Sequence, residues 1–157
     1  MIVFRSAQEN YIHDLSGYGA FLVGGRWTTV GTYALYTGLN RALSYVEYYV
    51  HQFESGTWPK DLRMASIEIP NEHADYIQLD LKKLPKNWTE LPYNYQIQKI
   101  GTDLFKEGKL GIFVPSVVVK GENNLILNPL HPDFKKKVKI QEIDVFNLDE
   151  RLKPKNK

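Results

Sequence analysis

The stretch YALYTGLNRALSYVEYYVHQF, residues 33–53, joins two hydrophobic patterns without a break. Its first four residues, Tyr33–Tyr36, form an apolar run of strand length. From Thr37 to Phe53, apolar residues recur at three- and four-residue intervals, which predicts an amphipathic helix with Thr37 as its N-cap. This segment therefore predicts a strand that leads directly into a long helix.

Most other apolar runs also have the length of a strand and are bounded by Gly, Pro, Asn or Asp. They are Met1–Phe4, Ala20–Val23, Met64–Ile69, Tyr76–Leu79, Ile112–Val119 and Leu125–Leu127. The segment Val138–Phe146 alternates apolar and polar residues with a phase slip near Glu142, which is typical of an edge strand with a bulge. A second helix is predicted over Tyr95–Lys106, with Gly108 available to end it.

Many short strands with few, irregularly placed helices indicate an α+β fold with mixed or antiparallel sheets. A doubly wound nucleotide-binding fold is disfavoured, because it needs strict alternation of strands and helices and a glycine fingerprint that this chain lacks. The length of 157 residues fits one domain over residues 1–157, and no linker or repeat divides it. Residues 150–157 are expected to form a flexible basic tail.

The composition narrows the classes of function. The chain has 20 Lys and Arg against 18 Asp and Glu, so a dedicated nucleic-acid binder with a strongly basic face is disfavoured. It has no cysteine, which excludes disulfides, thiolate nucleophiles and cysteine zinc sites. The four histidines lack paired spacing such as H-E-x-x-H, so no metal site is expected. The N-terminal residues resemble neither a signal peptide nor a membrane span, so we expect a cytoplasmic protein.

The first candidate for chemistry is Gly24-Gly25-Arg26-Trp27. Two glycines let the backbone turn tightly and approach a ligand, and the planar guanidinium of Arg26 suits a phosphate or diphosphate. The alternative is an ordinary hairpin in which Arg26 pairs with a carboxylate and Trp27 fills the core.

Two further candidates lie in or next to the predicted helix. Glu47 projects to the border of the apolar stripe, which would place its carboxylate at the mouth of a cleft. Tyr36 ends the preceding strand, where its ring could stack on a flat heterocycle. The alternatives are a rim glutamate paired with a surface cation and one more partly buried aromatic residue.

The third region contains Val114-Pro115-Ser116 and the asparagine-rich segment Asn123–Phe134. Ser116 would project from a bend, and the asparagines would supply amide donors and acceptors for a ligand. The Asn-Pro and His-Pro pairs are also good turn formers. A serine hydrolase could combine Ser116 with His131 and either Asp133 or Asp149, but the G-x-S-x-G elbow is absent.

Taken together, these segments resemble the RES domain, a family named for its Arg, Glu and Ser residues. The resemblance extends over nearly the whole chain and is carried by Phe4-Arg5, Gly24-Gly25-Arg26-Trp27, Leu35-Tyr36-Thr37, Ala42–Glu47, Leu84–Trp88, Gln98–Asp103, Val114-Pro115-Ser116, Asn123–Phe134 and Asp149–Leu152. One departure is Thr28 after Trp27, where many members have asparagine. The resemblance implies a fold like that of ADP-ribosyltransferase toxins, in which split antiparallel or mixed sheets bind NAD in a central cleft.

The resemblance also implies roles for individual residues. Glu47, Arg26 and Ser116 would be the catalytic residues: Glu47 would face the ribosyl oxocarbenium cation that forms when nicotinamide leaves, Arg26 would bind the diphosphate, and Ser116 would orient the substrate. Tyr36 would stack on the nicotinamide, and Arg5 and Asn124 would make further contacts with NAD.

By the same resemblance, the protein is a toxin that degrades NAD, which is its substrate and not a resident cofactor. The acceptor could be water, phosphate or a protein side chain, and the last would make the chain an ADP-ribosyltransferase. A non-catalytic module that binds a nucleotide or a protein is the alternative from another class. The expected partner is an antitoxin with a helix-turn-helix region, which would make the DNA contacts, and a homodimer within that complex is compatible with the resemblance. No membrane partner is expected.

Overall fold

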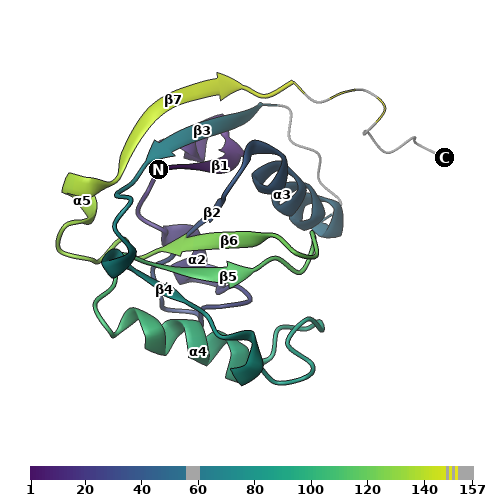
Figure 1. The fold of residues 1–157 in the computed structure, drawn as a ribbon. Helices are drawn as coiled ribbons and strands as arrows, with labels where there is room; N and C mark the ends of the chain where they lie inside the picture. Colours follow the sequence, from purple (N-terminus) through teal and green to yellow (C-terminus); the bar gives the residue numbers. More distant parts are fainter. Residues whose placement is uncertain (56–60, 148, 150, 152–157) are drawn as a thin grey trace.

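The computed structural model describes residues 1–55, 61–147, 149 and 151. Its centre is a seven-stranded sheet with the order β4-β5-β6-β2-β1-β3-β7 (Figure 1). Neighbouring strands are antiparallel except β4 and β5, so the sheet is mixed. The strands are β1 (Ile2–Gln8), β2 (Leu35–Gly38), β3 (Leu62–Glu68), β4 (Tyr76–Gln78), β5 (Gly111–Pro115), β6 (Asn123–Leu127) and β7 (Lys139–Val145).

Two longer helices pack on different parts of this sheet (Figure 1). Helix α3 (Arg41–Ser55) contacts β1 and β2, and α4 (Tyr95–Phe105) contacts β5. The remaining helical segments are α1 (Glu9–Ile12), α2 (Tyr18–Val23), α5 (Phe134–Lys137) and the 3-10 turns η1 (His73–Asp75) and η2 (Leu81–Lys83). Helices and strands do not alternate regularly, so the predicted α+β class is confirmed.

The sheet consists of two halves that meet at a narrow junction. Strand β1 pairs with β3 along its whole length, but its pairing with β2 is the single pair Phe4 and Gly38. The half β4-β5-β6-β2 therefore diverges from the half β1-β3-β7, as the predicted split sheet requires. Beyond this single pair, Ser6 of β1 and Tyr36 of β2 line one cavity together with residues of α3.

Alternation along the strands builds two main cores. In β6, Leu125 and Leu127 belong to a cluster that spans both halves of the sheet, with Val3 and Ile67. Ile126 points to the opposite face and packs in a second cluster under α4. Side chains that alternate between faces are the expected result of the two-residue period of a strand.

Several predicted elements agree closely with the structure. Helix α4 begins after Asn94, whose Oδ1 accepts from the Gln96 N–H at 2.8 Å. Strand β7 is an edge strand, and its register against β3 shifts between Glu142 and Ile140. The bulge predicted near Glu142 is therefore confirmed at the neighbouring Gln141.

Three predicted boundaries or elements are wrong. Ala20–Val23 lies in helix α2 and not in a strand, because an apolar run of four residues does not by itself distinguish the two. Thr37 lies inside β2 and its hydroxyl donates to the Leu125 carbonyl at 2.7 Å, so it does not cap α3. That cap is Asn40, whose Oδ1 accepts from the Leu43 N–H at 2.8 Å. The run Ile112–Val119 is a strand only as far as Pro115.

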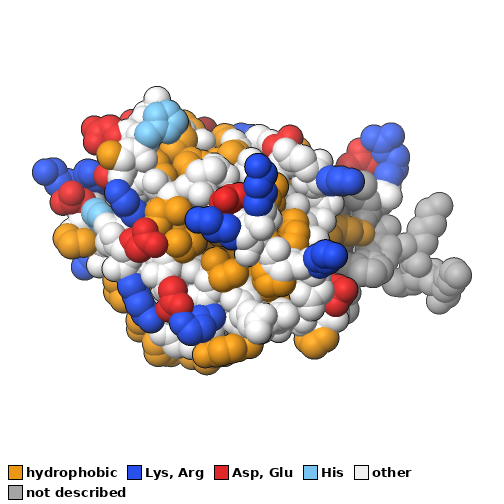
Figure 2. All heavy atoms as spheres, turned by 60° about the horizontal axis from the view of Figure 1, so that its bottom comes forward, with side chains coloured by type: hydrophobic (Ala, Val, Ile, Leu, Met, Phe, Trp, Pro, Cys, Tyr) orange, Lys and Arg blue, Asp and Glu red, His pale blue; other side chains and the backbone are white. Residues whose placement is uncertain are grey.

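The surface mixes charges of both signs. On the face drawn in Figure 2, Lys and Arg side chains are interspersed with Asp and Glu, and apolar side chains lie between them. Lys137 is partnered by Asp75 at 3.1 Å and by Asp133 at 3.6 Å. The proposed basic tail at 150–157 lies outside the described residues, apart from Arg151, which pairs with Asp149.

Candidate active site

A cavity of about 500 Å³ opens where the two halves of the sheet diverge. A volume of this size lies within the usual range for small-molecule sites. Strands β1, β2 and β6 form its floor, and helices α2 and α3 form its sides. The lining residues are Ser6, Gly19, Ala20, Val23, Gly24, Tyr36, Thr37, Gly38, Ser44, Glu47, Tyr48, His51 and Asn124.

Glu47 projects into this cavity from α3, as its position at the border of the apolar stripe predicts. Its Oε1 accepts two short hydrogen bonds, from Ser116 Oγ at 2.6 Å and from Asn124 Nδ2 at 2.6 Å. Both donors approach the same oxygen, so within the described part of the chain Oε2 receives no hydrogen bond. Two hydrogen bonds to one oxygen fix the orientation of the carboxylate and leave the second oxygen for a ligand.

Ser116 is placed for this bond by the bend that follows β5. The residue is only 5% exposed, its N–H donates to the Glu122 carbonyl at 2.8 Å, and its Oγ accepts from the Val119 N–H at 2.8 Å. The Ser116 hydroxyl donates its hydrogen bond to Glu47, and no histidine among the described residues bonds to it. His131 Nδ1 instead accepts from the Asp133 N–H at 3.1 Å, so the serine-hydrolase alternative is wrong.

Asn124 lies in β6, beside the junction of the two half-sheets. Its Nδ2 holds Glu47, while its buried Oδ1 has no partner among the described residues. A buried acceptor without a donor is rare in folded proteins, and in a cavity wall it indicates a position where a ligand can supply the donor.

Tyr36 lines the same cavity from β2. Its hydroxyl is within hydrogen-bond distance of Thr28 Oγ1 at 3.0 Å and accepts from the Trp27 N–H at 3.3 Å. Burial raises the pKa of Tyr36 to about 12, so the phenol stays neutral at physiological pH. Thr28, the departure from the family pattern, is fully buried and serves to hold this hydroxyl.

Arg26 lies elsewhere. Its Nη1 donates to the Trp88 carbonyl at 2.8 Å and to the Glu90 carbonyl at 3.1 Å, and its guanidinium lies 5.0 Å from the centre of the Tyr93 ring. Arg26 is absent from the cavity lining, so the structure does not bring it together with Glu47 around one cavity. The alternative of a carboxylate partner is also wrong, because backbone carbonyls take that place, but Trp27 does fill the core.

Arg5, unlike Arg26, lines a pocket that adjoins the cavity. It lines a side pocket of about 210 Å³ that shares Ser6, Gly19, Ala20 and Tyr36 with the main cavity. Its Nη1 donates to the Tyr11 and Ile12 carbonyls at 2.7 and 2.9 Å. Burial lowers the pKa of Arg5, and the nearby Asp14 carboxylate opposes that shift. An arginine remains charged in this setting, so the side pocket has a fixed positive group, which the Asp14 carboxylate in the same lining partly balances.

Comparison with known proteins now identifies the family. The RES domain model matches residues 2–149. The chain belongs to the RES domain family. A protein named Toxin Res from Photorhabdus laumondii is 35% identical over 155 residues, which is 97% of each chain. A protein named Prs ADP-ribosylating toxin from a Sphingobium species is 34% identical over 141 residues, with 88% of this chain and 86% of that protein covered.

A solved structure supports the fold of this RES domain. A chain in the crystal structure of the Mycobacterium tuberculosis MbcT-MbcA toxin-antitoxin complex superposes with a TM-score of 0.72. The match covers 92% of this chain and 83% of that chain at 16% sequence identity. At this level of identity the comparison shows the fold alone.

The RES domain also contains cavity residues that the sequence analysis missed. His51 lies one helical turn after Glu47 on α3, and its spacing of four residues was the available signal. Ser6 and Ser44, which bond to each other at 3.0 Å across the cavity floor, had no such signal.

Among the described residues, no group of three or more His, Asp or Glu side chains is arranged to hold a metal ion. None of the helices described here combines the length and the apolar character that a membrane span needs.

Proposed function

We propose that this RES domain protein is the toxin of a toxin–antitoxin pair and that it breaks the bond between nicotinamide and ribose in NAD. The observation that carries the proposal is Glu47, a carboxylate held by Ser116 and Asn124 in the wall of a cavity of suitable size. Sequence similarity to a protein named Toxin Res, over 97% of both chains, supports the toxin role.

The chemistry explains why a fixed carboxylate is needed. When the C–N bond breaks, its electron pair goes to the nicotinamide nitrogen, which becomes neutral, and positive charge develops on the ribosyl group. A carboxylate that is already oriented stabilises this cation without further reorganisation. The acceptor then donates a lone pair to the ribosyl carbon and loses a proton. We assign the cation-facing role to Glu47, with its Oε2 turned to the substrate, and the positioning roles to Ser116 and Asn124.

The neighbouring residues support a binding mode for NAD. The Tyr36 ring forms part of the cavity wall and would lie against the nicotinamide. The unpaired Oδ1 of Asn124 would accept from a ribose hydroxyl. We place the diphosphate at Arg5, because Arg5 lines the side pocket that adjoins the cavity and Arg26 lines neither of the two.

Two fates of the ribosyl group remain as separate proposals. Transfer to water or to inorganic phosphate would deplete NAD in the cytoplasm, and this is the reaction that we favour. Transfer to a protein side chain is the second candidate, and the specific observation in its favour is the 34% identical relative named Prs ADP-ribosylating toxin. NAD is the substrate in both cases, and we propose no resident cofactor.

The partner is also a proposal. The structural neighbour belongs to a toxin-antitoxin complex, which supports an antitoxin for this chain as well. We expect that antitoxin to carry a helix-turn-helix region that makes the contacts with DNA, and we allow for a homodimer of the toxin inside the complex.

The test is release of nicotinamide from NAD by the purified protein. Glu47→Gln keeps an acceptor for Ser116 and Asn124 but removes the charge, so it should fold and lose about 10²- to 10³-fold in rate. Glu107→Gln makes the same change at an exposed carboxylate that does not line the cavity and serves as the control. Intact NAD after long incubation with folded wild-type protein would overturn the proposal. Label from NAD on a macromolecule, in place of free ADP-ribose or its phosphate, would favour the second candidate.

A further inference from the structure

Helix α4 lies directly against the segment 24–32, which connects α2 to β2. Contact between the two backbones is close at Gly101, where an added Cβ would lie 1.9 Å from the Trp27 carbonyl oxygen. Trp27 is 3% exposed and packs in the same cluster as Ile97 and Phe105 of α4. The segment therefore packs against α4, so a displacement of the helix would also displace the segment.

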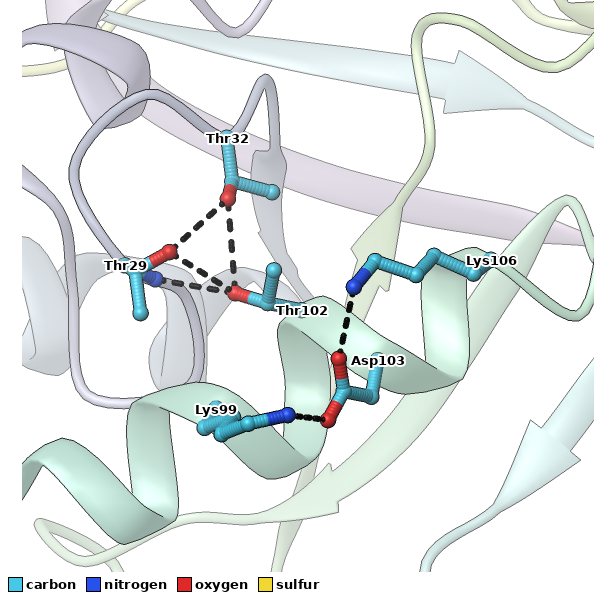
Figure 3. A network of polar contacts seen from close by, with 6 residues as sticks. All are labelled: Thr29, Thr32, Lys99, Thr102, Asp103 and Lys106. Atoms are coloured by element: carbon cyan, nitrogen blue, oxygen red, sulfur yellow. Dashed lines mark hydrogen bonds and ion pairs between the residues drawn. The ribbon is translucent and has the colours of Figure 1, made fainter.

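One side chain of α4 makes most of the polar contacts with this segment. Thr102 Oγ1 accepts from the Thr29 N–H at 3.0 Å and lies 3.3 Å from both the Thr29 and the Thr32 hydroxyl oxygens (Figure 3). Thr29 and Thr32 complete the triangle at 3.2 Å. One turn earlier on the helix, Gln98 Nε2 donates to the Gly25 carbonyl at 2.8 Å.

The other side of the same segment belongs to the candidate active site. Gly24 lines the cavity, and the Trp27 N–H and the Thr28 hydroxyl hold the Tyr36 hydroxyl. The fit is tight, because an added Cβ at Gly25 would lie 2.4 Å from that hydroxyl oxygen. A displacement of the segment would therefore move one wall of the cavity and the ring of Tyr36.

We propose that Thr102 is a positioning residue for the substrate site: through Thr29 and Thr32 it fixes the segment that orients Tyr36. This inference rests on the proposed function of the cavity as the NAD site. Thr102 touches no substrate. Its effect reaches the cavity through the segment, and Gln98 supports the same segment at its glycine end.

The test compares two neighbouring positions of α4, of which only Thr102 contacts the segment. Thr102→Val keeps the shape of the side chain but removes the acceptor for the Thr29 N–H, and it should raise KM for NAD about tenfold, the effect of one lost hydrogen bond. The value of kcat should change little, because Tyr36 contacts the ring before and during bond cleavage. Thr102→Ser retains the hydroxyl and should restore the wild-type KM.

The matched control is Asp103→Asn. Asp103 forms ion pairs with Lys99 and with Lys106 on the outer side of the helix (Figure 3). This variant perturbs the same helix without touching the segment, so KM should remain at the wild-type value. An unchanged KM in Thr102→Val, or an equal rise in Asp103→Asn, would overturn the inference, as would failure of Thr102→Ser to restore KM.

Amide hydrogen exchange separates this inference from the proposed function. If wild-type protein leaves NAD intact, the proposed function fails, and exchange at residues 24–32 still reports on Thr102. We expect faster exchange there in Thr102→Val than in the wild type and Asp103→Asn, and equal exchange would overturn the positioning role. Gln98→Leu, which removes the donor to Gly25, should act in the same direction and replaces Thr102→Val if that variant does not fold.

Discussion

Replacing Ser116 by alanine removes a single oxygen and breaks two hydrogen bonds. One is the 2.6 Å donation to Glu47 Oε1, and the other is the 2.8 Å bond from the Val119 N–H. The first concerns the carboxylate that we propose faces the substrate, and the second concerns the bend after β5. Ser116→Ala therefore predicts two separable effects, one on NAD cleavage and one on stability.

The size of each effect follows from these contacts. A hydrogen bond to a charged group contributes about 1.5–3 kcal/mol, which corresponds to about 10- to 150-fold in rate. Because Asn124 still donates to the same oxygen of Glu47, we expect the lower end, about tenfold. The unpaired N–H of Val119 should cost about 1–3 kcal/mol, which lowers Tm by roughly 2–10 °C for a chain of this size.

The assay is nicotinamide release at saturating NAD, paired with thermal unfolding of the same sample. Ser66→Ala is the control, because Ser66 is also buried and accepts from Arg41 Nη2 at 3.1 Å but does not line the cavity. It should lower Tm with no loss of kcat. If folded Ser116→Ala cleaves NAD at the wild-type rate, the bond to Glu47 has no role in catalysis and the reasoning from this geometry is refuted.

Three further predictions follow from the cavity wall. Gly25→Ala places a Cβ 2.4 Å from the Tyr36 hydroxyl oxygen and should weaken NAD binding in a titration. Asn124→Asp puts a second carboxylate beside Glu47, so the two carboxylates retain a shared proton to higher pH. The acidic limb of the pH–rate profile should therefore shift to higher pH. The pKa of Tyr36 is raised to about 12 in the folded chain, so between about pH 10 and 12 the unfolded state binds fewer protons and stability falls as pH rises. Tyr36→Phe should reduce that slope in alkaline unfolding curves, and an unchanged slope would contradict the burial of the phenol.

Local patterns in the sequence predicted much of the framework. The three- and four-residue spacing of apolar residues identified the helices that became α3 and α4, and the phase slip near Glu142 identified the bulged edge strand β7. These features depend on residues within one element, so periodicity is sufficient to find them. The helical projection of Glu47 also predicted its place at a cavity, because the direction of a side chain on a helix follows from its position.

The contacts of the candidate site depend on residues far apart in the chain. Glu47 is held by Ser116 and Asn124, which are 69 and 77 positions away, and only the pairing of β2 with β6 and of β5 with β6 brings them together. The contacts of Arg26 also could not be predicted from the sequence, for the same reason. Its residue type indicated an anion site, but its Nη1 donates to carbonyls 62 and 64 positions away, while Arg5 lies beside the cavity. The sequence by itself determined the fold class, the main helices and the place of Glu47 at the edge of the apolar stripe, because short-range periodicity encodes them. The proposed catalytic role of Glu47 came from the resemblance to the RES domain. The tertiary structure alone decided which side chains surround that carboxylate, because a polar group bonds to whichever partner the fold places within reach.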